Sequence, residues 1–208
     1  EKVALFWSGV LCTGFSKVDN SRQMTLYIDT LRKYGFGNYR DLIVEISRHP
    51  TMAYFLDNVE NHNGSPNENY GRELPELFSM GVGMDGKDNY TEDDVKACAQ
   101  AFTGWNLAPT VPVFPYGRTP FQFRYDPADH DDSEKTFLGE TGPWNGQDIV
   151  EIICKNEATP RFICTRLFQF FAADDVDEEG ERVIEEMMAS YFDSEYEIRS
   201  VVRTLFNS

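Results

Sequence analysis

Acidic residues, amides and one arginine are concentrated in residues 65–83, whose sequence is SPNENYGRELPELFSMGVG. At helical spacing, Glu68, Arg72 and Glu76 are four residues apart and lie on one face. Asn67 stands where a side-chain oxygen would cap the helix, and Glu68 falls in the first turn, where a negative charge is favourable. The segment predicts either a capped surface helix with a salt-bridge ladder or a buried polar cluster that binds a ligand.

If the cluster is buried, its carboxylates are the groups that would perform chemistry. Glu68 and Glu73 are predicted to act as acid and base or to bind a metal, because a positioned carboxyl group can serve either role. Arg72 is predicted to hold an anionic group of a substrate or to orient Glu76, since a guanidinium binds carboxylates and phosphates through paired hydrogen bonds.

A second candidate site surrounds His130 in the segment 126–134, whose sequence is DPADHDDSE. One imidazole among carboxylate oxygens suits Mg²⁺, Ca²⁺, Mn²⁺ or Zn²⁺. The segment lacks the glycine that an EF-hand loop needs for its turn, and a solvated acidic turn is the alternative interpretation. If the two sites meet, His130, Asp131 and Glu73 are the predicted ligands of a divalent metal, and His130 is also a predicted catalytic residue.

We expect the start of the central helix and the His130 loop to meet in a cleft. The predicted substrate-binding residues would border this cleft, and they are Asp57, Asn58, Asn67, Asn69, Trp105 and Lys135. Trp105 follows the end of a predicted helix and is also expected to pack in the core.

The spacing of apolar residues predicts a mainly α fold, with many helices in one domain. Helices are expected to begin near Ser21, Tyr39, Thr51, Asn67, Thr91, Gly146, Thr159, Val183 and Ser194. The apolar segment 1–15 is expected to form a buried helix or turn. Residues 121–125 alternate in polarity and predict a strand. Its predicted partner is 135–138, which gives one small β-hairpin around 121–138.

Several local signals specify how these helices begin and end. Thr91 with Asp94, and Ser194 with Glu197, have the spacing of a capping box. His49 precedes Pro50 at a helix end, where a cationic imidazole would favour the helix dipole. Pro75 is predicted to kink the central helix.

Composition limits the classes of partner. The 208 residues carry a formal charge of −16, from 19 basic and 35 acidic residues, and contain no basic cluster. Duplex nucleic acids and anionic membranes are therefore poor partners, whereas a cation or a cationic protein would be attracted. No apolar run reaches the roughly 18 residues that a membrane-spanning helix needs.

The four cysteines, Cys12, Cys98, Cys154 and Cys164, are widely spaced and form no CxxC pair. We expect three of them to be buried free thiols, which weakly favours a reducing compartment such as the cytoplasm. The chain begins with Glu1 and ends directly after a helical pattern, so we expect residues 1–208 to be a single helical domain from a longer protein. An export signal upstream of Glu1 is compatible with this interpretation.

The chain resembles the bacterial family known as domain of unknown function 1800. The segment 65–83 carries this resemblance together with FWSGVLCTGF at 6–15, LDN at 56–58, YTEDDVKACAQAFTGW at 90–105, HDDSEKTFLGETG at 130–142 and ATPRFICTRLFQFF at 158–171. The resemblance covers essentially the whole chain. It implies a mostly helical fold and no established activity.

The chain departs from the family pattern at several positions. The family has the pattern Trp-His-x-His-Phe near its start. This chain has Ser8 and Val10 at the two histidine positions. Pro75 stands where the family has leucine or methionine, and Ser133 where it has glycine. Two functions remain open: a cleft with hydrolase-like or metal-assisted chemistry, inactive if the missing histidines are needed, and a non-catalytic interaction or scaffolding module.

Overall fold

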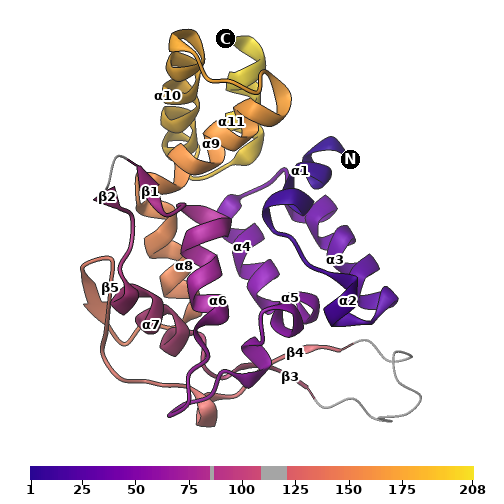
Figure 1. Ribbon diagram of the computed structural model, residues 1–208, viewed down its shortest axis with the longest axis vertical. Helices are drawn as coiled ribbons and strands as arrows, with labels where there is room; N and C mark the ends of the chain where they lie inside the picture. Colours follow the sequence, from indigo (N-terminus) through magenta and orange to yellow (C-terminus); the bar gives the residue numbers. More distant parts are fainter. Residues whose placement is uncertain (85–86, 109–120) are drawn as a thin grey trace.

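The computed structural model describes residues 1–84, 87–108 and 121–208 and confirms the mainly α fold. The α-helices are α1 (Lys2–Val10), α2 (Phe15–Val18), α3 (Ser21–Tyr34), α4 (Tyr39–Arg48), α5 (Pro50–Phe55), α6 (Glu68–Glu73), α7 (Glu92–Ala101), α8 (Gly146–Lys155), α9 (Ala158–Phe171), α10 (Glu178–Asp193) and α11 (Ile198–Asn207). Figure 1 shows α10 and α11 at one end of the long axis, with α1 to α5 on one side and α6 to α8 beside them.

One hydrophobic core joins these helices, and its large aromatic residues carry polar atoms that need partners. The indole nitrogen of Trp7 donates to the Gly35 carbonyl over 2.6 Å, and the Tyr39 hydroxyl donates to the Phe78 carbonyl over 2.8 Å. Trp7 and Tyr39 are completely buried. A buried polar atom without a partner destabilises the fold, so these bonds allow the aromatic residues to pack inside.

The strands form short antiparallel pairs among the described residues. They are β1 (Gly83–Met84) with β2 (Lys87–Asp88), β3 (Trp105–Leu107) with β4 (Phe123–Tyr125), and β5 (Lys135–Phe137) with β6 (Glu140–Gly142). The predicted pairing of 121–125 with 135–138 is therefore wrong. Leu138 and Gly139 both have positive φ, at 48° and 83°, and this tight turn returns the chain from β5 directly to β6. Strand β4 pairs instead with β3, where the Trp105 and Phe123 rings lie 5.3 Å apart.

Pro75 changes the type of helix. The α-helical register of α6 ends at Glu73, and a π-helix, η2 (Leu74–Ser79), follows without a break. The Met80 amide donates to the Pro75 carbonyl over 2.8 Å, five residues back, as a π-helix requires. The disturbance that we predicted at Pro75 thus takes the form of a change of register.

The predicted caps have different outcomes. Thr91 and Asp94 form the expected capping box at the start of α7. At Ser194 and Glu197 only half of the predicted box forms: the Ser194 hydroxyl accepts a bond of 3.3 Å from the Glu197 amide, but α11 begins at Ile198 and Glu197 makes no side-chain cap. The turn before it takes another path: Tyr196 has a φ of 75°, and its carbonyl accepts a bond from the Tyr39 amide.

His49 caps a helix, but not as the predicted cation. Its Nδ1 accepts a hydrogen bond from the Thr51 amide at the start of α5. An imidazole nitrogen that accepts a bond carries no proton. Burial lowers the pKa of His49 to about 4, so the ring is neutral near pH 7.

Apolar residues around most of the circumference of α9 predict a central position for this helix. The structure corrects this expectation. Ile163, Cys164 and Leu167 are buried, but Phe170 is 44% exposed and Phe162 is only partly buried. The helix lies at the boundary between the core and an open surface.

The remaining structural predictions concern cysteines and membrane spans. Cys98, Cys154 and Cys164 are buried free thiols, as predicted, and Cys12 is exposed. Burial raises the pKa of the Cys154 and Cys164 thiols to about 12, so both are protonated near neutral pH. Within the described ranges, no helix combines the length and apolarity of a membrane span.

Candidate functional site

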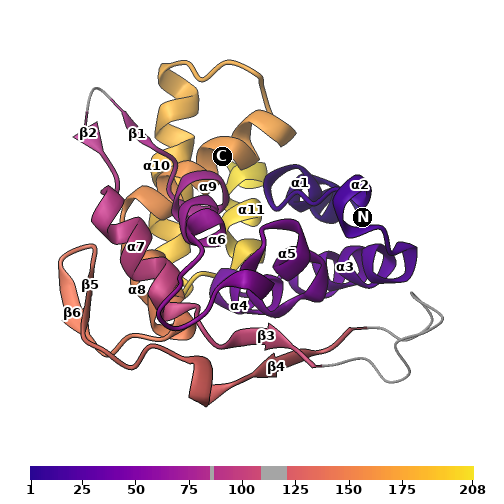
Figure 2. The same ribbon diagram turned by 60° about the horizontal axis from the view of Figure 1, so that its bottom comes forward.

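Helix α7 lies at the centre of the predicted site, because both candidate segments are attached to it. On one side α6 packs against it, and an added Cβ at Gly71 would lie 2.8 Å from the Ala99 amide nitrogen. On the other side the Asp94 carboxylate of α7 accepts a bond of 2.7 Å from the Leu138 amide. Figure 2 shows α6 beside α7, with β3 and β4 along the end of the molecule that comes forward.

Two buried asparagines attach the loop before α6 to α7 and β3. The Asn58 amide nitrogen donates to the Trp105 carbonyl over 2.9 Å, and that of Asn61 donates to the Ala99 carbonyl over 2.8 Å. Asn61 also donates to the side-chain oxygen of Asn58. Asn58 was predicted to bind a substrate, whereas Asn61 was missed because it looks like an ordinary loop residue.

The other predicted amides continue this network. The Asn61 oxygen accepts from the Asn67 amide over 2.9 Å, and the Asn67 side chain caps α6 by accepting from the Asn69 amide. The Asn69 side chain donates to the Asp57 carboxylate over 3.1 Å. Lys17 from α2 pairs with the same carboxylate at 2.7 Å. Four predicted substrate-binding residues are thus joined to one another or to the backbone. Trp105 accepts the Asn58 bond through its carbonyl, and Lys135 bonds within the His130 loop.

The predicted contact between the start of the central helix and the His130 loop is replaced by one from the loop before α6. His62 and Asn63 make it and were not predicted to take part, whereas their partner Asp129 lies in the predicted segment 126–134. His62 Nδ1 lies 2.5 Å from an Asp129 carboxylate oxygen, and the Asn63 amide donates to the other oxygen over 3.1 Å. The Asn63 side chain donates to the His130 carbonyl.

His130 is buried, with its ring held against the end of α7. Its Nδ1 lies 2.9 Å from the Thr103 carbonyl, which can only accept, so Nδ1 carries the proton. The Thr103 hydroxyl accepts a bond from the Asp131 amide. The other ring nitrogen, Nε2, lies 3.9 Å from an Asp132 oxygen, beyond hydrogen-bond distance. In the neutral ring the lone pair is therefore on Nε2.

Lys135 stabilises the loop from the inside. Its buried ammonium group donates to the carbonyls of Asp131 and Ser133 and lies 3.8 Å from an Asp131 carboxylate oxygen. Burial lowers the pKa of Lys135, and the Asp131 charge only partly opposes this. Burial acts to raise the pKa of Asp131, but bonds from Ser133 and the Lys135 charge outweigh it and lower that pKa.

The charged ladder of the central helix is only partly formed. Arg72 binds both carboxylate oxygens of Glu92, each over 2.7 Å, and lies 3.5 Å from Glu68. Glu92, on α7, was missed by the sequence analysis. Because the register changes at Leu74, Glu76 does not continue the ladder and instead accepts a bond of 2.7 Å from the Tyr90 hydroxyl.

Glu73 differs from its neighbours. Its side chain makes no hydrogen bond or ion pair with any residue in the described ranges. Partial burial and the nearby charge of Glu76 raise the pKa of Glu73, and Arg72 opposes this effect.

Trp105 packs with the Phe102 ring at 4.9 Å and is 5% exposed, which agrees with the predicted core position.

The predicted metal ligands do not form a cluster in the described part of the chain. Across 1–84, 87–108 and 121–208, no group of three or more His, Cys, Asp or Glu residues is arranged to hold a metal ion. The structure therefore does not gather Glu73, His130 and Asp131 into one ligand set. Catalytic and binding roles for the individual residues remain predictions.

Comparison with known proteins agrees with the resemblance seen in the sequence. The family described as "Protein of unknown function (DUF1800)" matches residues 1–208. No curated protein and no solved structure matches the chain.

Proposed function

The chain belongs to the DUF1800 family, and we propose that this domain is a non-catalytic interaction module. One observation carries the proposal: most polar groups of the predicted site are already bonded to one another or to the backbone. A catalytic group must reach a substrate atom, and a side chain that holds a loop in place is not free to do so without breaking that loop.

The amides and charges of the network have this structural character. Asn58 and Asn61 donate to backbone carbonyls of β3 and α7, and Lys135 donates to carbonyls of its own loop. Arg72 donates to both carboxylate oxygens of Glu92. This pairing leaves Arg72 less able to bind an anionic substrate. The network fixes the loops around α7 into a rigid scaffold.

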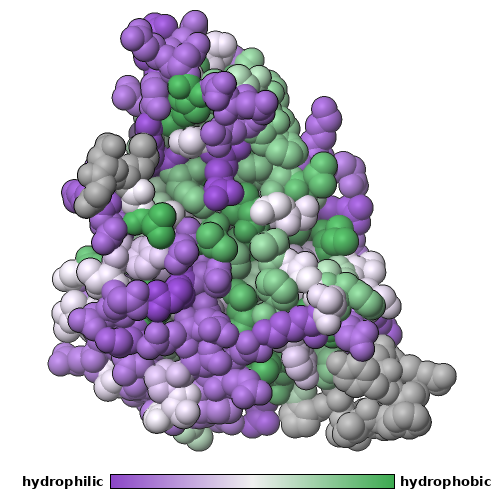
Figure 3. Space-filling model, viewed as in Figure 1, coloured by the Kyte–Doolittle hydropathy of each residue, from purple (hydrophilic) through white to green (hydrophobic). Residues whose placement is uncertain are grey.

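An interaction module also needs an exposed surface that favours contact, and α1, α9 and α11 provide one. The Phe170 ring packs on Phe6 at 5.5 Å and on Phe171 at 4.8 Å, and Phe171 packs on Phe206 at 5.7 Å. Phe206 is 64% exposed. Figure 3 shows a continuous hydrophobic area on the viewed face, over the C-terminal helices and reaching the centre of the molecule. A contiguous exposed apolar patch of this kind is typical of an interaction surface.

The proposal is tested by thermal unfolding of the wild type, Glu73→Gln, His130→Ala and the double variant. Each is measured with chelator and with Mg²⁺, Ca²⁺, Mn²⁺ and Zn²⁺ in turn. We expect the two effects on the free energy of unfolding to add within about 0.5 kcal/mol, because residues without shared partners act independently. A metal that raises the wild-type midpoint and not that of the variants would contradict the proposal.

Metal-assisted or hydrolase-like chemistry is the second candidate, and one observation favours it. Glu73 has a raised pKa and no bonded partner in the described part of the chain, as a general acid or base requires. The His130 Nε2 atom, which lies beyond hydrogen-bond distance of Asp132, is the other group that this candidate function would use. The metal arm of the same experiment supports this candidate if stabilisation depends on both residues.

A further inference from the structure

A groove between α9 and the hairpin β1–β2 differs from four other cavities formed by the described residues. It has a volume of about 670 Å³ and is lined by the turn before β1, by β2 and by one face of α9. An added Cβ at Gly81 would lie 3.0 Å from the Phe162 ring, so the turn and the helix are in close contact at the floor. The Asn89 side chain donates to the carbonyls of Met80 and Gly81 and fixes this wall.

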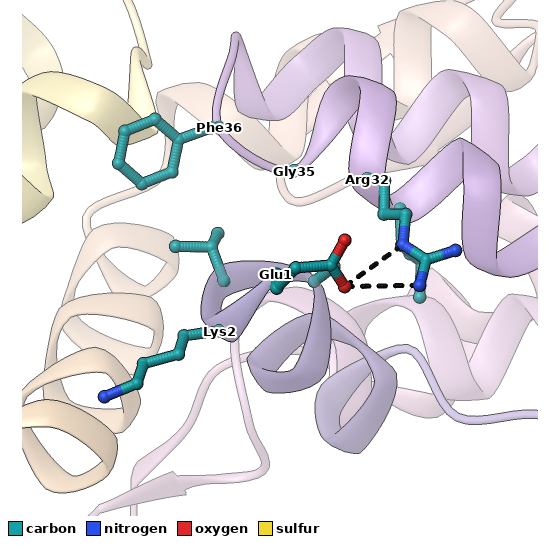
Figure 4. Close-up of a pocket in the computed structure, with 8 residues that line it drawn as sticks. Glu1, Lys2, Arg32, Gly35 and Phe36 are labelled. Atoms are coloured by element: carbon teal, nitrogen blue, oxygen red, sulfur yellow. Dashed lines mark hydrogen bonds and ion pairs between the residues drawn. The ribbon is translucent and has the colours of Figure 1, made fainter.

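The charge of the groove opposes that of the chain. Among the described residues, its lining includes the cationic Lys87, Arg161 and Arg166 and no carboxylate, although the chain has 35 acidic and only 19 basic residues. Four other cavities formed by the described residues each include at least one carboxylate. One of these lies between α1 and α3, where Figure 4 shows the Glu1 carboxylate bonded to Arg32.

Two of the three cations in the groove form no ion pair with a carboxylate of the described residues. Arg161 pairs with Glu181 of α10 at 2.5 Å. The Arg166 guanidinium instead lies over the Phe162 ring, 4.4 Å from its centre. Neither Arg166 nor Lys87 forms an ion pair with a carboxylate of the residues that the structure describes. An anion that enters the groove therefore meets two cations that are not paired with a carboxylate within 1–84, 87–108 and 121–208.

The groove also contains apolar surface. Phe162 is partly buried and Val82 is 59% exposed, and both border the cavity. Burial of an apolar side chain against this surface is favourable in proportion to the area removed from water. The occupant that fits both properties has an apolar group next to negative charges.

We propose that the groove binds an acidic peptide segment of another protein, with one large apolar side chain against Phe162 and Val82 and carboxylates beside Arg166 and Lys87. This inference rests on the proposed function, for which it names a binding site and a partner chemistry. The overall charge of −16 repels duplex nucleic acid and anionic membranes, which present many phosphates over a long surface. A short peptide meets mainly the local charge of the groove.

Binding of labelled synthetic peptides to the whole chain tests this proposal by fluorescence anisotropy. The probe has one phenylalanine flanked on each side by two glutamates. Two control peptides replace the glutamates by lysines or the phenylalanine by alanine. We expect the probe to bind, with an affinity that falls as salt rises, and each control peptide to bind at least about tenfold more weakly.

Two double variants with the same change of net charge locate the site. Arg166→Gln with Lys87→Gln removes the unpaired cations of the groove, and we expect it to weaken probe binding about tenfold. Arg182→Gln with Lys96→Gln removes exposed cations outside the groove and should leave binding unchanged. Val82→Ser tests the apolar contribution.

No binding of the probe, or equal binding by the groove variant and the wild type, would overturn the groove inference. The proposed function would still be decided by the separate unfolding experiment with metals, so the two failures can be told apart.

Discussion

Gly71 of α6 lies directly against the backbone of Ala99 in α7. An added Cβ at Gly71 would be 2.8 Å from the Ala99 nitrogen, and it would also meet the Val95 carbonyl oxygen at 2.9 Å. Both atoms belong to the helix backbone, which cannot turn aside as a flexible side chain would. The helix that carries Glu68, Arg72 and Glu73 is thus held against α7 at a position that only glycine fits.

We predict that Gly71→Ala lowers the free energy of unfolding by about 2 kcal/mol, because overpacking costs more than the gain in helix propensity. Gly9→Ala is the matched control: Gly9 is in the exposed part of α1, and an added Cβ there meets nothing within 4 Å. This variant should gain about 0.5–1 kcal/mol. Chemical unfolding measures both, and equal effects would refute the close packing of α6 on α7.

The neutral His49 cap predicts a specific dependence of stability on pH. The pKa of His49 is lowered from 6.5 to about 4 in the folded protein. Between these values the unfolded chain binds a proton that the native state does not, so stability falls as pH falls from 6.5 to 4. The full effect is roughly 3 kcal/mol, and it is absent above pH 6.5.

His49→Asn keeps a capping side chain and removes the titration. The difference in free energy of unfolding between wild type and variant should therefore change across this window, while effects of carboxylates common to both proteins cancel. Urea unfolding at a series of pH values measures it. A constant difference would show that His49 is not buried as a neutral acceptor.

Lys135→Met should lower the free energy of unfolding by about 1–3 kcal/mol, since it keeps the aliphatic volume but leaves the carbonyls of Asp131 and Ser133 without their donor. Lys96→Met is the control, because Lys96 is exposed and makes only a surface pair with Asp93. Its effect should stay within about 0.5 kcal/mol. If the two variants behave alike, Lys135 does not organise the loop.

Pro75→Leu should change the free energy of unfolding by less than about 1 kcal/mol, even though an interior proline normally costs about 3 kcal/mol. The restored amide favours α-helical register. The Tyr39 bond to the Phe78 carbonyl and the Ser79 bond to the Leu74 carbonyl both favour the π-helix. A gain of several kcal/mol on chemical unfolding would mean that the π-helix is merely imposed by the proline.

Local signals in the sequence were sufficient where the structure depends on neighbouring residues. The capping box of Thr91 and Asp94 and the cap at Asn67 involve groups within a few positions of each other, and both are present. The turn at Ser194 forms only one of the two predicted capping bonds, and Tyr196 within it accepts a bond from the amide of Tyr39. Its conformation depends on a partner that no local pattern reveals.

Local sequence signals also predict only part of the candidate site. The start of the central helix was expected to meet the His130 loop, but the contact to Asp129 of that loop comes from His62 and Asn63, which carry no motif of their own. Arg72 was expected to extend a ladder along its own helix, yet it binds Glu92 on α7 more closely. Side-chain pairing across helices follows from packing, which the sequence pattern does not specify.

The bridge between the start of α4 and the start of α11 has a consequence for the opening motions of the protein. The Tyr39 amide donates to the Tyr196 carbonyl over 2.9 Å, and the Ile198 amide donates to the Gly37 carbonyl over 3.0 Å. Both bonds break only when the C-terminal helices separate from the N-terminal half. In native-state hydrogen exchange these two amides should therefore exchange with the same opening free energy, although they lie far apart in the chain.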